Sequence, residues 1–126
     1  MSRKKGSIRS TGYCMDVYRG SRKNNAPILM YPCHGGPNQK FTYHSKTKHI
    51  RSLYSRKCLD IRKGRIVQKK CSQTRKSQQW RRDGKRRFRS EQNNRCIDVE
   101  GGDYRSGKLI TYPCHVGPNQ RFDMSR

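Results

Sequence analysis

The chain has 126 residues, a formal net charge of +23, and only 29% hydrophobic residues. This length fits a single domain, but so basic and apolar-poor a composition, taken alone, is typical of disordered chains. The longest apolar run, Ile28 to Tyr31, excludes a membrane span, and no apolar segment follows the basic residues 1–6, so we expect no signal peptide in the sequence.

In chain order, residues 1–12 form a basic segment with Gly and Ser, which we expect to be a flexible arm. An arm that contacts a polyanion is the alternative. Short stretches rich in Ile, Val and Tyr follow, separated by Gly, Asn and Pro, and none keeps a helical period. They predict short strands joined by turns. The main stretches are residues 13–17, 28–33, 57–61, 66–71, 95–99 and 109–114.

The sequence contains an internal repeat, one stretch of which occurs twice with few changes. Residues 28–41 and 109–122 share Tyr-Pro-Cys-His, then Gly-Pro-Asn-Gln, a basic residue and Phe, and a degenerate copy ends at residues 78–80. Each copy opens on Cys-x-Asp-Val/Ile, and the period is about forty residues, repeated three times. We therefore expect one domain over residues 13–126, built from repeats 13–55, 56–94 and 95–126.

Three units with thin apolar faces can bury those faces only against each other, which predicts packing around a pseudo-threefold axis. Each copy closes on Gln-x-aromatic. We expect the aromatic side chains to fill the centre and the amides to be buried and to satisfy turn backbone groups. The aromatic residues are Phe41, Trp80 and Phe122, and the amides are Gln39, Gln78 and Gln120.

These opening and closing motifs resemble the ricin B-type (R-type) lectin β-trefoil over residues 13–123. The residues at 31–39 and 76–80 are similar in sequence to the lectin domain of polypeptide N-acetylgalactosaminyltransferases. The resemblance implies an all-β fold, a β-trefoil of twelve strands, with six forming a barrel and six closing one end as hairpins. It also implies that the domain binds a sugar and does not catalyse a reaction on it. No nucleophile with a base, and no paired catalytic carboxylates, are evident, so we expect neither enzyme activity nor a cofactor.

Six cysteines, two per copy, indicate an oxidising or extracellular compartment. This conflicts with the expected lack of a signal peptide; either a leader was removed or the disulfides form by another route. Zinc is the rival interpretation, but adjacent Cys-His pairs lack the usual ligand spacing, so we expect no metal. One equivalent pair per repeat predicts Cys14–Cys33, Cys58–Cys71 and Cys96–Cys114.

A galactose-type sugar needs a carboxylate, an amide and an aromatic ring. The residues that match the family's sugar-binding positions are Asp16, Tyr31, His34 and Asn38 in repeat one, and Asp98, Tyr112, His115 and Asn119 in repeat three. An aspartate that only caps a turn is the alternative. Repeat two keeps Asp60 but has Lys69 and Ser77 in place of the ring and the amide, so we expect it to be structural only.

Three functions remain open. The first is a lectin that binds galactose or N-acetylgalactosamine-type glycans through repeats one and three. The second is a binder of polyanions, such as nucleic acid or sulfated glycans, or of an acidic protein surface, through basic clusters such as residues 75–89. The third is a structural or minor component of a larger assembly, such as a virion, that uses a lectin fold.

Overall fold

The computed structural model describes residues 3–125, which form twelve β-strands and five 3-10 turns, with no α-helix in this range. None of the helical segments in this range is both long and apolar enough to cross a membrane. The strands are β1 (Arg3–Ser10), β2 (Tyr13–Val17), β3 (Ile28–Pro32), β4 (Phe41–His44), β5 (His49–Ser52), β6 (Cys58–Arg62), β7 (Arg65–Lys69), β8 (Trp80–Arg82), β9 (Phe88–Ser90), β10 (Cys96–Val99), β11 (Leu109–Tyr112) and β12 (Asp123–Ser125).

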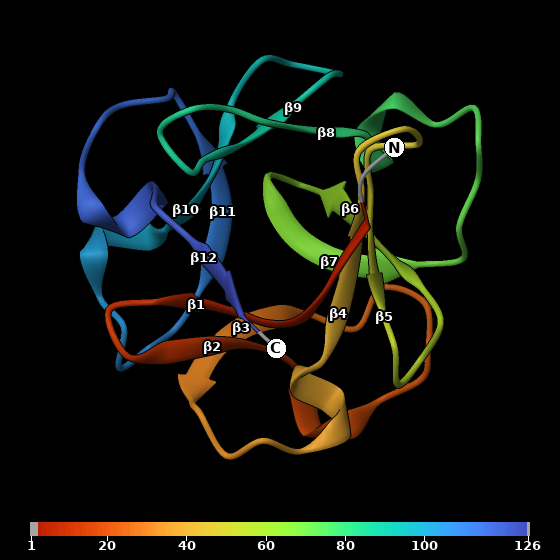
Figure 1. Cartoon of the computed structure of the whole chain (residues 1–126), viewed down its shortest axis with the longest axis horizontal. Coiled ribbons are helices and arrows are strands. Elements are labelled where there is room, and N and C mark those ends of the chain that lie inside the picture. The colour runs from red at the N-terminus through yellow and green to blue at the C-terminus, as the bar shows by residue number, and fades with distance from the viewer. Residues whose placement is uncertain (1–2, 126) are drawn as a thin grey trace.

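Figure 1 shows three lobes arranged around the centre of the molecule. Each lobe contains one hairpin, β2–β3, β6–β7 or β10–β11. Backbone hydrogen bonds join the three hairpins in a ring. They include Met30 N to Gly107 O at 2.8 Å, Gln68 N to Ala26 O at 2.9 Å and Thr111 N to Gly64 O at 2.9 Å. This ring is the hairpin layer of a β-trefoil.

The other six strands form the barrel. Strand β1 pairs with β4 and β12, β4 pairs with β5, and β8 pairs with β9. Two single bonds, Trp80 N to Lys48 O at 2.8 Å and Phe122 N to Arg86 O at 3.0 Å, link the remaining neighbours. The twelve-stranded β-trefoil expected from the resemblance is therefore confirmed.

The core lies along the threefold axis. Phe41, Trp80 and Phe122, which close the three repeats, are completely buried, as the repeat pattern predicted. Burying three such rings removes a large apolar area from water, the dominant stabilising contribution in a chain with so few apolar residues.

The prediction of a flexible arm over residues 1–12 is wrong for the part that the structure describes. Residues 3–10 form β1, which pairs with β2, β4 and β12, while Met1 and Ser2 lie outside the described residues. The physical reason is Ile8, whose side chain is completely buried in the core. The sequence carries a signal for it, because Ile8-Arg9-Ser10 matches residues 50–52 in β5 and 88–90 in β9, the barrel strands that precede the second and third hairpins.

The three disulfides join Cys14 to Cys33, Cys58 to Cys71 and Cys96 to Cys114, as predicted. They close loops with sequence separations of 19, 13 and 18 residues, each contributing about 3 kcal/mol in the chain-entropy model. Three such bonds suit an oxidising or extracellular environment.

Candidate sugar-binding site

Each repeat places one buried aspartate on the first strand of its hairpin: Asp16 on β2, Asp60 on β6 and Asp98 on β10. An amide from the following 3-10 turn donates to each carboxylate. Gln39 Nε2 lies 2.8 Å from Asp16 Oδ2, and Gln120 Nε2 lies 2.8 Å from Asp98 Oδ2. The repeat pattern predicted that the glutamines would be buried, but it did not indicate that their amides would donate hydrogen bonds to the aspartates.

The same glutamines fix the turn after each second cysteine. Gln39 Oε1 accepts from the backbone N–H of His34 at 2.9 Å, and its Nε2 also donates to Pro32 O at 3.1 Å. Gln120 repeats both contacts, with His115 N at 2.8 Å and Pro113 O at 3.1 Å. The amide therefore ties the histidine turn to the carboxylate.

In repeat one the four predicted residues surround one hollow of about 540 Å³. Asn38 Nδ2 donates to Asp16 Oδ1 at 3.1 Å, and His34 Nε2 lies 3.4 Å from Asp16 Oδ2. The Tyr31 ring is 52% exposed and stands edge-on to the imidazole, with 6.1 Å between ring centroids. The site thus offers an acceptor, an amide, an imidazole and an exposed apolar ring in one concavity.

Sequence reasoning missed the other residues that line this hollow, among them two polar pairs. Tyr18 and Arg19 follow β2, whereas Arg105 and Ser106 come from the turn between β10 and β11 of the third repeat. No signal in the sequence pairs the latter two with repeat one. They reach it because the N–H of Met30 donates a hydrogen bond to Gly107 O, which holds the β10–β11 turn against β3. The two backbones are so close that a Cβ on Gly107 would clash with Met30 O.

Repeat three has the same geometry around Asp98. Asn119 Nδ2 donates to Asp98 Oδ1 at 3.3 Å, and His115 Nε2 lies 3.4 Å from Asp98 Oδ2. The Tyr112 ring is 50% exposed and lies edge-on to His115, at 6.2 Å between centroids. The structure therefore brings together both predicted sets of four residues.

A glycine fixes the orientation of each histidine. The N–H of Gly36 donates to His34 Nδ1 at 2.9 Å, and the N–H of Gly117 donates to His115 Nδ1 at 2.9 Å. Because Nδ1 accepts, Nε2 carries the hydrogen of the neutral ring and directs it at the carboxylate. A Cβ on Gly36 would lie 2.7 Å from His34 Cε1, so glycine makes room for the ring.

Repeat two uses its carboxylate differently. Arg75 Nε donates to Asp60 Oδ2 at 3.0 Å, and the N–H of Ile61 donates to Asp60 Oδ1 at 2.6 Å. Gln78 Nε2 also bonds Oδ2, at 3.1 Å. The guanidinium thus lies against the carboxylate, an arrangement the sequence analysis did not foresee.

The ionisation of the three carboxyls follows this division. Burial raises the pKa of Asp16 and of Asp98, and the hydrogen bonds from the glutamines and the interactions with the histidines offset it only partly. Burial also acts to raise the pKa of Asp60, but hydrogen bonds from Ser77, the Ile61 amide, Gln78 and Arg75 outweigh it and lower the pKa. Raised carboxyl pKa values in a concavity are typical of functional sites.

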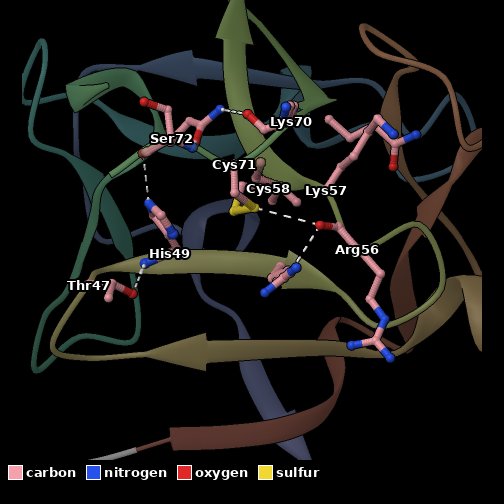
Figure 2. Close-up of a disulfide and its surroundings, with 12 residues drawn as sticks. Thr47, His49, Arg56, Lys57, Cys58, Lys70, Cys71 and Ser72 are labelled. Atoms are coloured by element: carbon pink, nitrogen blue, oxygen red, sulfur yellow. Dashed lines mark hydrogen bonds between the residues drawn. A yellow bond between two sulfur atoms is a disulfide. The ribbon is translucent and has the colours of Figure 1, made fainter. Parts of the chain in front are cut away.

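One further cluster has metal-ligand geometry among the described residues: His49 with Cys58 and Cys71. Figure 2 shows the imidazole beside the disulfide, with Nε2 donating to Ser72 O at 3.2 Å. The two sulfurs are bonded to each other, so neither is a thiolate ligand. The cluster is a disulfide packed against a turn-anchoring histidine.

Comparisons with known proteins agree with this fold. The family model described as ricin-type beta-trefoil lectin domain matches residues 3–124. No curated protein sequence matches the chain. Among solved structures, the hemolytic lectin CEL-III is 26% identical, with a TM-score of 0.84 over 98% of this chain; the chain spans only 30% of CEL-III.

Two other solved structures show the same fold. The C-half of the earthworm R-type lectin, solved with GalNAc, has a TM-score of 0.83 and 22% identity, covering 96% of this chain and 97% of that one. GalNAc-T7, solved with UDP, GalNAc and Mn²⁺, has a TM-score of 0.80 and 21% identity, covering 97% of this chain and 22% of that one. From the family match over almost its whole length, the chain belongs to the ricin-type β-trefoil lectin family.

Proposed function

We propose that the protein is a lectin that binds galactose or N-acetylgalactosamine-type glycans at two sites, in repeats one and three, without catalysing a reaction. The observation that carries the proposal is the duplicated set of an aspartate, an asparagine and an Nε2-protonated histidine beside a half-exposed tyrosine ring. This set occurs around Asp16 and again around Asp98. Two lectin structures of the same fold contain bound sugars: GalNAc in the earthworm lectin, and N-acetyl-D-lactosamine in the β-trefoil lectin of the Vibrio vulnificus hemolysin/cytolysin.

The chemistry of each set suits such a sugar. The carboxylate accepts hydrogen bonds from two neighbouring hydroxyls, and the asparagine amide and the imidazole supply further polar contacts. The exposed ring of Tyr31 or Tyr112 packs against the apolar face of the pyranose. Raised pKa values indicate carboxyls that the protein alone leaves incompletely stabilised, and sugar hydroxyls would complete their hydrogen bonding.

Calorimetric titration with N-acetylgalactosamine tests the proposal. We expect two equivalents bound per chain, and no binding to a folded Asp16→Ala/Asp98→Ala double variant. Absence of binding to any galactose-type sugar by the wild-type protein, or full binding by the folded double variant, would show that the function lies elsewhere.

A polyanion binder is the second candidate, and the net charge of +23 favours it. Such binding would release counterions, so its affinity would fall by about a thousandfold or more between about 50 and 200 mM salt if six to ten charges were neutralised. Neutral-sugar binding would change little over that range. Titration of heparin and of N-acetylgalactosamine across these salt concentrations separates the two functions.

A further inference from the structure

A second hollow, of about 340 Å³, lies beside the turn at residues 115–117 in repeat three. Residues 84–87 of the turn between β8 and β9 form one wall, and residues 115–117 with Arg121 form the other. His115 belongs to both places, because its Nε2 also lies 3.4 Å from Asp98 Oδ2. The hollow therefore shares His115 with the candidate sugar site of repeat three.

We propose that this hollow binds an anionic substituent, a carboxylate or a sulfate, of a glycan whose galactose-type residue occupies the Asp98 site. Repeat three would then have an anion subsite, formed by the β8–β9 turn, that repeat one does not share. This inference rests on the proposed lectin function and deepens it.

The wall of the hollow is held in place before any ligand arrives. Arg87 Nε lies 2.7 Å from Asp83 Oδ2, and Arg87 Nη1 donates to His115 O at 2.9 Å. The side chain of Arg87 is only 14% exposed, so it acts as an anchor between the two walls. Phe122 N bonds Arg86 O at 3.0 Å, which fixes the same turn to the end of the repeat. A preorganised wall lowers the entropic cost of binding.

Cations at the hollow remain available to a ligand. Lys85 and Arg121 are exposed, and within residues 3–125 neither side chain has a hydrogen-bond or ion-pair partner. Arg86 pairs with Asp123 at 3.0 Å, but both side chains are more than 60% exposed, so the pair is readily exchanged for another anion. An anionic group would gain charge-assisted hydrogen bonds from these residues.

Repeat one lacks most of this wall. Residues 7–10 align with residues 87–90, so Gly6 and Ser7 stand where repeat three has Arg86 and Arg87. Two cations remain at equivalent places, Lys5 for Lys85 and Lys40 for Arg121. The two sites therefore share their sugar-binding residues and differ in where the cations lie. Arg19 and Arg105 line the hollow of repeat one itself, whereas the cations of the β8–β9 turn line a second hollow next to His115.

The loop beside the histidine differs as well. Val116, which is 70% exposed at the rim of the hollow, replaces Gly35 of repeat one. Its side chain adds an apolar surface next to the cations. An acidic sugar, which carries both a charge and an apolar ring face, fits this combination.

The shape of the hollow favours a glycan over a nucleic acid. It is a small concavity of about 340 Å³ that shares His115 with a candidate sugar site. Its lining residues include no Phe, Tyr or Trp on which a base could stack. A nucleic acid would require a longer basic groove with such rings.

The experiment compares lactose, sialyllactose and sulfated lactose by calorimetry with the full chain at about 150 mM salt, where long-range attraction is screened. We expect an acidic form to bind one of the two sites about tenfold more tightly than lactose, the gain from one or two charge-assisted hydrogen bonds. Lys85→Glu/Arg121→Glu should abolish this gain and leave lactose binding at both sites unchanged.

The matched control is Lys5→Glu/Lys40→Glu, which changes the net charge equally at the equivalent positions of repeat one and should keep the gain. Asp98→Ala should remove the gain together with one lactose site. The inference is overturned if neither acidic form binds more tightly than lactose, or if both charge reversals reduce the gain equally. It is also overturned if the gain survives in Asp98→Ala, which would indicate a polyanion surface independent of sugar. Failure of lactose to bind the wild-type protein would instead refute the lectin function itself.

Discussion

Arg75 Nε lies 3.0 Å from Asp60 Oδ2, so the carboxylate of repeat two is paired with a cation of its own repeat. The equivalent carboxylates, Asp16 and Asp98, each have a histidine at 3.4 Å instead. The aspartate at the equivalent position of each repeat thus forms an internal ion pair in one repeat and belongs to a candidate binding site in the other two.

Replacing Arg75 by alanine tests the structural role of this pair. We expect the free energy of unfolding to fall by about 1 kcal/mol, because the arginine is partly exposed and solvent screens the interaction. The variant should gain no sugar site, since Lys69 stands where the other repeats have a tyrosine. Urea unfolding measures the change, with Arg62→Ala, an exposed arginine on β6, as the control. An unchanged midpoint would show that the pair adds nothing to stability.

Replacing one aspartate at a time should show which repeats bind sugar. Asp16→Ala and Asp98→Ala should each reduce sugar binding from two equivalents to one, because each removes the carboxylate of one site. Asp60→Ala should lower stability but leave two equivalents bound to the folded protein. Calorimetry at saturating sugar gives the stoichiometry, and fewer than two equivalents bound to folded Asp60→Ala would contradict the assignment.

Sugar binding should weaken in acid before the protein unfolds. The ionised carboxylate accepts the sugar hydroxyls, and burial raises the pKa of Asp16 and Asp98 above the ordinary 3.8, so affinity should fall as the pH drops through these raised values. Asp60 has a lowered pKa. Its contribution to stability is present above its unfolded value and disappears only as the pH falls through the lowered folded value.

The pH prediction is checked by titrating sugar at a series of pH values while circular dichroism follows the fold. Loss of binding should precede loss of structure. Coincident loss of both would mean that unfolding, and not protonation of the two carboxyls, ends binding.

A methyl group on Gly117 should damage one site through His115. An added Cβ would lie 2.9 Å from His115 Cε1 and 3.0 Å from Asn119 Oδ1, so the ring must move away from the carboxylate. We expect Gly117→Ala to lower the affinity of one site about tenfold, the loss of one hydrogen bond. Gly84→Ala is the control, because a Cβ there meets nothing within 4 Å. Unchanged affinity at both sites in Gly117→Ala would remove the histidine from the proposed mechanism.

The sequence predicted the parts of the fold that carry long, distinctive repeat motifs well, and the part with only a short repeat signal poorly. The Cys-x-Asp and Gln-x-aromatic motifs recur with a fixed period, so they indicated the trefoil, the disulfides and the buried rings. Strand β1 was missed because its basic residues dominate its composition, whereas one buried side chain, Ile8, decides its structure.

The site shows the same limit. The residues expected around each aspartate are brought together because they belong to one repeat, and local motifs specify their arrangement. Arg105, Ser106 and the wall formed by residues 84–87 come from other parts of the chain, and only the packing of hairpins and turns brings them near a site. Similarly, no motif in the sequence indicated that Arg75 would neutralise Asp60.

All six cysteines are used in bonds within single repeats, and none is free. Apart from the backbone, no covalent bond therefore connects one repeat to the next. A protease that cuts the turn at residues 84–87 would leave two fragments held together only by the shared aromatic core and the strand pairing. Such a nicked molecule would remain whole in native buffer, yet its fragments would separate on a denaturing gel without any reducing agent.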